Sequence, residues 1–246
     1  MSDQPTSSAD ATVTTEPAGR WEDFVDLFYA PASVFARRAN SSFWIPMIVT
    51  SVLLAATLLL TFNMLSPAFE AEVSRAMAVA AKSNPALTPD AIAQATGLQM
   101  KIAKYSSGVF VPIIITIVAL ALWLSGKIVG AKQSWNAALV VASYAYFPKA
   151  LEPIVNGVIA MMSNPATLTG RYRVGLGLGR FLDPETASPL LLAVLGRLDV
   201  FTLGVTVLIA VGVSVTGRVS RAEGAMVGVI VWLVGAIPTV LPTLMK

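Results

Sequence analysis

The chain has 246 residues, of which 55% are hydrophobic and only 13% are charged. A soluble domain carries roughly 25% charged residues, so this composition indicates an integral membrane protein with room for one bundle of helices. There is no Cys and no His, which excludes disulfides, a Ser-His-Asp triad and the usual zinc sites. The formal net charge of +3 is small and scattered, so we expect no nucleic-acid partner. We also expect no cofactor.

The N-terminal part of the chain predicts a tail followed by a lead-in to the membrane. Residues 1–20 are rich in Ser, Thr, Ala, Asp and Pro, which is typical of a disordered tail. They lack the basic region and the directly following apolar core of a signal peptide. The membrane domain is expected to fill residues 21–246, and it opens with a lead-in, residues 21–40, that Pro31 divides into two short pieces.

Two interpretations of this lead-in stay open. In the first, it is an interfacial helix that lies on the membrane and offers a surface to a protein partner. In the second, it is a connection that packs under the bundle. The candidate partner surface consists of the aromatic, apolar and acidic residues Trp21, Phe24, Asp26, Leu27, Phe28, Pro31 and Phe35.

Five apolar stretches predict an all-α bundle of five transmembrane helices in the lipid bilayer. About 20 apolar residues are needed to cross a hydrocarbon core of ~30 Å, and the expected spans are residues 43–65, 108–129, 135–162, 200–216 and 224–245. Ser66-Pro67 and Thr88-Pro89 each have the pattern of an N-cap followed by proline at the first helical position. They predict two helices, ending near Lys82 and Lys104, that form a hairpin outside the bilayer after the first span.

The charges beside the first span predict the orientation. Arg37 and Arg38 precede this span, whereas Glu70 and Glu72 follow it. Basic residues favour the cytoplasmic side, so we expect a multi-pass protein of the inner cell membrane with a cytoplasmic N-terminus. After five spans the C-terminus would lie outside, and so would the three arginines of the loop at residues 163–189, which the rule does not favour.

The third apolar stretch contains the most costly residues of the chain, Lys149 and Glu152, set between two prolines. An ionisable group at mid-bilayer costs roughly 2.5–3.5 kcal/mol, and residues at i and i+3 on a helix can pair. The pair is either a site for an ion, a proton or a polar ligand on a broken helix, or a structural pair that faces the bundle interior beside Arg197 or Asp199. The candidate intramembrane polar site consists of Tyr144, Tyr146, Pro148, Lys149, Glu152 and Asp199.

Two glycine patterns stand out. Gly175, Gly177 and Gly179 alternate in the loop before the fourth span, but the strand, helix and acidic residue of a dinucleotide-binding loop are missing, so we predict a flexible or hairpin-like loop. Gly224 and Gly228 form a small-xxx-small pair that lets helices approach closely. This contact is either inside the chain or between two copies in a homo-oligomer.

Two segments carry a resemblance to a known family. Residues 26–35, with Asp26, Leu27, Phe28, Pro31 and Phe35, resemble the Asp-Leu-Phe-x-x-Pro-x-x-x-Phe form of the signature found before the first span in prokaryotic Yip1-domain proteins. The eukaryotic form, Asp-Leu-Tyr-Gly-Pro, has one residue fewer before the proline. Residues 143–148, Ser-Tyr-Ala-Tyr-Phe-Pro, are similar to the family's Gly-Tyr segment with its following proline, and the layout of five spans also matches.

The resemblance implies a five-span bundle without catalytic activity. Eukaryotic relatives are scaffolds for membrane trafficking that engage small GTPases through a cytoplasmic N-terminus. We therefore expect a membrane scaffold or organiser and no enzyme. The alternative is a transporter or channel component that uses Lys149 and Glu152.

Overall fold

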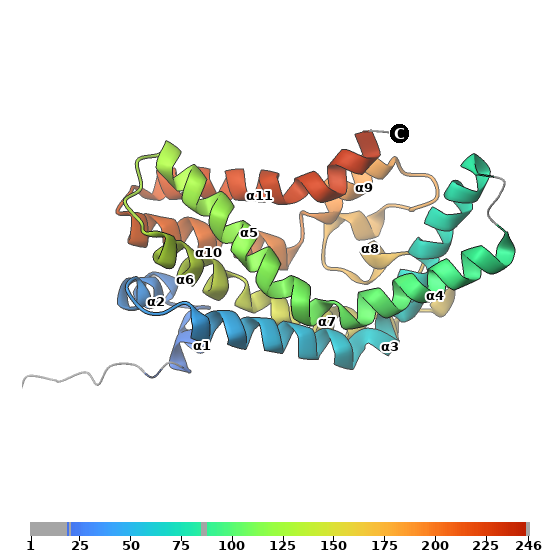
Figure 1. Cartoon of the computed structure of the whole chain (residues 1–246), viewed down its shortest axis with the longest axis horizontal. Coiled ribbons are helices and arrows are strands. Elements are labelled where there is room, and N and C mark those ends of the chain that lie inside the picture. Colours follow the sequence, from blue (N-terminus) through green and yellow to red (C-terminus); the bar gives the residue numbers. More distant parts are fainter. Residues whose placement is uncertain (1–18, 20, 85–87, 245–246) are drawn as a thin grey trace, which may run out of the picture.

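The computed structural model describes residues 19, 21–84 and 88–244, and within these residues every regular element is a helix. The expected tail, residues 1–20, lies outside the described residues except for Gly19. Figure 1 shows an elongated bundle in which some of the long helices run along its length and another crosses them at an angle. In chain order, with η for short 3₁₀ helices, the elements are α1 (Glu22–Asp26), α2 (Pro31–Arg38), α3 (Trp44–Ser83), α4 (Pro89–Tyr105), α5 (Ser107–Ile128), α6 (Trp135–Ala145), η1 (Phe147–Leu151), α7 (Glu152–Met162), η2 (Pro165–Thr167), α8 (Arg171–Val174), η3 (Leu178–Phe181), α9 (Pro189–Gly196), α10 (Val200–Gly217) and α11 (Arg221–Leu244).

Four of the described helices, α3, α5, α10 and α11, are long and apolar enough to cross a membrane. They contain the first, second, fourth and fifth expected spans, which confirms the prediction of an all-α membrane protein. The expected third span is not one helix, because residues 135–162 form α6, η1 and α7. The count of five spans is therefore not confirmed.

The interruption of the third segment has a local cause and a tertiary one. Proline lacks the N–H that an α-helix needs, and Pro148 and Pro153 lie in η1 and in the first turn of α7. The preceding helix is enclosed by its neighbours, since every residue from Ala137 to Ala145 is buried. Irregular backbone at membrane depth is tolerated where protein covers it, so the centre of this bundle is a place where a broken helix can persist.

The predicted break at Ser66-Pro67 is wrong. α3 runs without interruption through Pro67, which leaves the carbonyl of Asn63 without its usual backbone donor. The hydroxyl of Ser66 donates to this carbonyl at 3.2 Å. Ser66 therefore repairs the helix instead of capping a new one, as serine often does beside prolines in membrane helices.

The second half of the predicted hairpin begins as expected. Thr88 caps α4 by accepting a hydrogen bond from the backbone N–H of Ala91 at 3.2 Å, and Pro89 follows in the first turn. α4 packs against α3, and the two extend beyond the rest of the bundle (Figure 1). The location of this pair outside the bilayer remains a prediction.

Close contacts between small residues hold α10 in the bundle. A Cβ on Gly212 would lie 2.4 Å from Cγ1 of Val141 in α6, and a Cβ on Gly224 would lie 2.4 Å from the carbonyl oxygen of Ala210. A Cβ on Gly228 would likewise lie 2.8 Å from the carbonyl oxygen of Thr206. Gly224 and Gly228 therefore serve the α10–α11 contact inside the chain, and a homo-oligomer through this helix stays a prediction.

The bundle has two distinct ends (Figure 1). α1 and α2 lie at one end, next to the connections between α5 and α6 and between α10 and α11. α8 and α9 lie at the other end, near the C-terminal half of α3. Polar side chains are concentrated around α1 and α2, and again where the start of α7 meets the start of α10.

Candidate functional site

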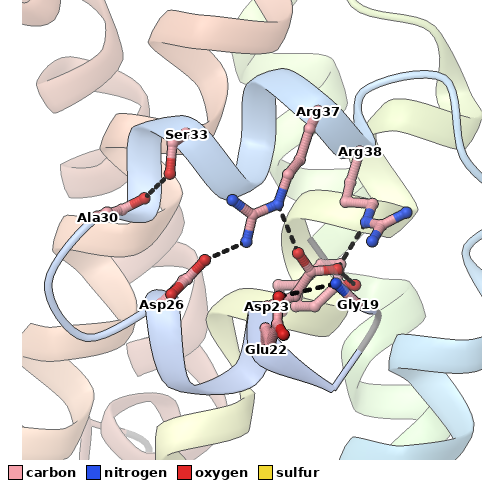
Figure 2. A network of polar contacts seen from close by, with 9 residues as sticks. Gly19, Glu22, Asp23, Asp26, Ala30, Ser33, Arg37 and Arg38 are labelled. Atoms are coloured by element: carbon pink, nitrogen blue, oxygen red, sulfur yellow. Dashed lines mark hydrogen bonds and ion pairs between the residues drawn. The ribbon is translucent and has the colours of Figure 1, made fainter. Parts of the chain in front are cut away.

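The first polar cluster is centred on Asp23, whose side chain is completely buried. Its two carboxylate oxygens accept hydrogen bonds from Nε of Arg37 and Nε of Arg38, both at 2.6 Å. The hydroxyl of Tyr144 in α6 donates to the same carboxylate at 3.0 Å. Figure 2 shows how Asp23 on α1 and the two arginines on α2 converge. The cluster ties α1 and α2 to each other and to the centre of the bundle.

A second acidic residue extends this cluster toward the surface. Asp26 forms an ion pair with Arg37, which lies between the two carboxylates (Figure 2). Hydrogen bonds from Arg37 and Tyr29 lower the pKa of Asp26 below its ordinary value. The lowered pKa keeps Asp26 ionised further into the acidic pH range than an ordinary aspartate, so the pair with Arg37 persists there.

Apolar contacts bury one face of the lead-in. Leu27 and Phe35 are almost fully enclosed, and the ring of Phe24 lies 5.3 Å from that of Tyr144 and 4.7 Å from that of Phe147. Three members of the predicted partner surface therefore belong to the core instead. This packing corresponds to the second of the two interpretations of the lead-in.

The opposite face of the lead-in remains open. Trp21 is 72% exposed, and Phe28 and Tyr29 are exposed beside it. Pro31 and Asp26 lie at the edge of this surface, half-buried. The structure thus divides the predicted partner surface into a buried half and an exposed aromatic half.

Asp23 is the residue that the sequence reasoning missed. Two signals could have identified it. The first is that the lead-in contains acidic residues in α1 and two arginines, Arg37 and Arg38, at the end of α2. The second is that a buried tyrosine such as Tyr144 needs a hydrogen-bond partner for its hydroxyl. The distance in sequence, 121 residues between Asp23 and Tyr144, concealed the third partner.

The second polar cluster lies where two interrupted segments meet. Nζ of Lys149 is 2.8 Å from Oε2 of Glu152 and 3.0 Å from Oγ1 of Thr202. Lys149 belongs to the interruption between α6 and α7, and Thr202 lies in the first turn of α10. Asp199 caps α10 by accepting from the N–H of Thr202 at 2.9 Å. Asp199 therefore supports this cluster through the helix terminus.

The predicted intramembrane polar site is divided by the fold. Tyr144 belongs to the Asp23 cluster, and Pro148 is buried in η1. Lys149, Glu152 and Asp199 line one cavity, while Tyr146 lines a neighbouring one that shares Lys149. Only part of the predicted set is brought together.

A cavity of about 350 Å³ lies beside Lys149 and Glu152. Its wall contains the basic side chains of Lys149, Arg171, Arg180 and Arg197 against the two acidic side chains of Glu152 and Asp199. The remaining wall includes apolar residues of α3, among them Leu58 and Leu65. With four cations against two anions, the lining has a positive excess of two charges.

The alternating glycines shape this cavity and are held in place by close packing. A Cβ on Gly177 would lie 3.1 Å from the carbonyl oxygen of Gly196, and a Cβ on Gly179 would lie 3.1 Å from the Cα of Gly196. Gly196 itself has no room for a Cβ, which would meet the ring of Tyr172 at 2.1 Å. The glycines allow the loop to lie directly against the end of α9; the prediction of a flexible or hairpin-like loop stays a prediction.

The described residues include no group of three or more His, Cys, Asp or Glu that could hold a metal ion. The bundle of long apolar helices around a broken, polar central segment defines a multi-pass membrane protein. The Yip1 domain family model matches residues 25–241, so the chain belongs to the Yip1 domain family, as the resemblance implied. No curated protein and no solved structure matches the chain.

Proposed function

We propose that the protein is a membrane scaffold or organiser without catalytic activity, and that it binds a protein partner through the exposed aromatic face of the lead-in. The observation that supports this proposal is the rigid attachment of that face. Trp21, Phe28 and Tyr29 flank α1 and are exposed, while Asp23 on α1 is fixed by two arginines and Tyr144.

Rigid aromatic side chains are well suited to binding. Trp and Tyr are enriched among the residues that dominate interface energies, and a surface that is ordered before binding loses less conformational entropy. The orientation with a cytoplasmic N-terminus is part of the proposal, supported by Arg37 and Arg38 before α3. The aromatic face would then be presented on the cytoplasmic side of the inner membrane.

Replacing Trp21 and Phe28 together by Ala is expected to reduce the recovery of a bound partner by at least about tenfold, because each such side chain contributes ≥2 kcal/mol at a typical hot spot. The measurement is purification of the full chain from native membranes in mild detergent, followed by quantitative mass spectrometry. Both side chains are exposed, so the thermal stability of the variant should equal that of the unchanged chain.

Phe181→Ala is the matched control, since Phe181 is 78% exposed at the opposite end of the bundle. It should leave partner recovery unchanged. A double variant that retains all partners would exclude this surface. Deleting residues 21–35 is a poorer test, because the deletion would also remove Asp23, Leu27 and Phe35 from the core.

A transporter or channel component is the second candidate, favoured by the meeting of two interrupted segments at a polar cavity. Transporters often place their sites at discontinuous helices near the bilayer centre. Here the interruption at residues 146–151 meets the one at residues 197–199, with Lys149 bonded across to Thr202. The same pair would then bind the transported ion or solute.

Lys149→Met combined with Glu152→Leu separates the two candidates. For a scaffold, we expect no proton or solute flux in proteoliposomes from either the unchanged chain or the double variant. The variant should fold, because replacing both partners of an enclosed ion pair by apolar residues is often neutral. Flux through the unchanged chain that disappears in the variant would overturn the scaffold proposal and establish the transporter.

A further inference from the structure

We propose that the cavity beside Lys149 is a binding site for one anionic phospholipid, with the phosphate among the arginines and the acyl chains in two adjoining apolar cavities. This inference goes beyond the proposed scaffold function and does not depend on it. It rests on charge, on unpartnered polar atoms and on the arrangement of three cavities.

The charge of the cavity favours an anion. Arg180 forms no ion pair within the part of the chain that the structure describes, and its only cation–π partner is the neighbouring Phe181. Arg171 reaches Glu72 at 3.4 Å, but both side chains remain partly exposed. Arginine binds phosphate through paired, charge-assisted hydrogen bonds. Arg180 is therefore available to a phosphate group, and Arg171, which also donates to the hydroxyl of Tyr172 at 3.2 Å, lies in the same cavity wall.

Two buried polar atoms in the cavity wall lack a partner among the described residues: Nε of Arg197 and Oδ1 of Asn156. The other guanidinium nitrogens of Arg197 are occupied, since they donate to the carbonyl oxygens of Gly235 at 2.8 Å and Trp232 at 2.9 Å. Buried polar groups normally have a partner. A phosphate oxygen would satisfy the free donor of Arg197, and a hydroxyl of the headgroup would satisfy the acceptor of Asn156.

Apolar cavities adjoin the polar one at Arg197. A cavity of about 310 Å³ between α5, α10 and α11 shares Lys149, Arg197 and Thr202 with it. A third cavity of about 370 Å³ runs along α9 and α11 and has Arg197 and Trp232 in common with the second. The walls of the third cavity are almost entirely apolar, from Val194 to Leu244.

A polar, cationic cavity beside two apolar ones matches the chemistry of a two-chain amphiphile. A soluble phosphate ester would leave both apolar cavities unused, and a zwitterionic lipid would bring a cation into a lining that is already positive. Like charges in a partly enclosed site repel each other. An anionic phospholipid satisfies the arginines, the free polar atoms and the apolar walls together.

The test uses the purified full chain in a mild non-ionic detergent, titrated with dioctanoyl phosphatidylglycerol and followed by native mass spectrometry. One lipid should bind, at least about tenfold more tightly than dioctanoyl phosphatidylcholine. Arg171→Gln with Arg180→Gln should remove this preference, because the two substitutions remove the charge-assisted hydrogen bonds to the phosphate. The matched control Arg221→Gln, at the opposite end of the bundle, removes the same kind of charge and should retain it.

Three results would overturn the proposal. The first is equal affinity for the two lipids, and the second is an unchanged preference in the double variant. The third is equally tight binding of glycerol 1-phosphate, which would identify a soluble phosphate ester as the ligand. If the double variant is not monodisperse, the single variant Arg180→Gln replaces it in the same comparison.

Discussion

Asp23→Ala is expected to lower the free energy of unfolding of the full chain by about 3 kcal/mol. Removing one partner of a buried ion pair typically costs 3–5 kcal/mol, and the lower end applies here because Arg37 and Arg38 keep partial access to solvent. For a chain of this size the melting temperature should fall by roughly 6–12 °C. Thermal unfolding in mild detergent, followed by tryptophan fluorescence, measures the change.

The effect should be specific to the buried carboxylate. Glu22→Ala removes the same charge one residue earlier, where the side chain bonds only the backbone N–H of Gly19 within the described residues, and it should change stability by no more than about 0.5 kcal/mol. Tyr144→Phe removes a single hydrogen bond to Asp23 and should cost about 1 kcal/mol. Equal melting temperatures for the Asp23 and Glu22 variants would contradict the role of Asp23 in holding α1 and α2 to the bundle.

The same substitution also connects stability to the proposed function. If the aromatic face binds through its rigidity, Asp23→Ala should weaken partner binding although it leaves Trp21 and Phe28 in place. Double variants of Asp23→Ala and Tyr144→Phe should be non-additive, because residues in one hydrogen-bonded network are coupled. Additive losses would indicate that the two residues act separately.

Gly224→Ala is expected to destabilise the chain by about 1–3 kcal/mol, the usual cost of forcing an extra carbon into a packed interface. The new Cβ would lie 2.0 Å from Oγ of Ser214 and 2.4 Å from the carbonyl oxygen of Ala210. The serine can rotate, but the backbone carbonyl cannot, so α10 and α11 must separate. Thermal unfolding measures the loss.

Gly204→Ala is the matched control on α10, since no atom of the described residues outside its own stretch of helix lies within 4 Å of the added Cβ. The exchange should be neutral or stabilising, because Ala favours helix over Gly by about 1 kcal/mol. Light scattering on both variants adds a second test. If Gly224 joined two copies, its substitution would dissociate an oligomer while leaving the stability of each chain unchanged, and that result would contradict the contact inside the chain.

Much of the local structure could be predicted from residues close together in sequence. The break at Pro31, the start of α3 at Trp44 and the cap at Thr88 each depend on a few neighbouring residues, and each is present. Ser66-Pro67 has the same pattern as Thr88-Pro89, yet α3 continues through it. The difference is that Ser66 donates to the carbonyl that Pro67 leaves free, an outcome that the capping pattern alone does not contain.

The candidate sites were less predictable, because their partners are distant in sequence. The pair of Lys149 and Glu152 follows from i and i+3 spacing, whereas its third member, Thr202, lies 53 residues away. Asp23 could not be recognised as a site residue from its neighbours in sequence, because its partners come from α2 and α6. The cavity beside Lys149 depends on Arg171, Arg180 and Arg197, which the sequence places in and beside a loop and the fold brings to one wall.

The sequence by itself determined the class of this protein. Apolar runs of membrane length, sparse charge and the motifs at residues 26–35 and 143–148 are enough for a helical member of the Yip1 domain family, because the length and hydrophobicity of a membrane-spanning segment can be read from residue order alone. Only the tertiary structure decided which half of the lead-in is buried, that the central segment is broken, and where the arginines gather. Those features depend on long-range packing, in which Asp23 meets Tyr144 and Gly196 meets Tyr172.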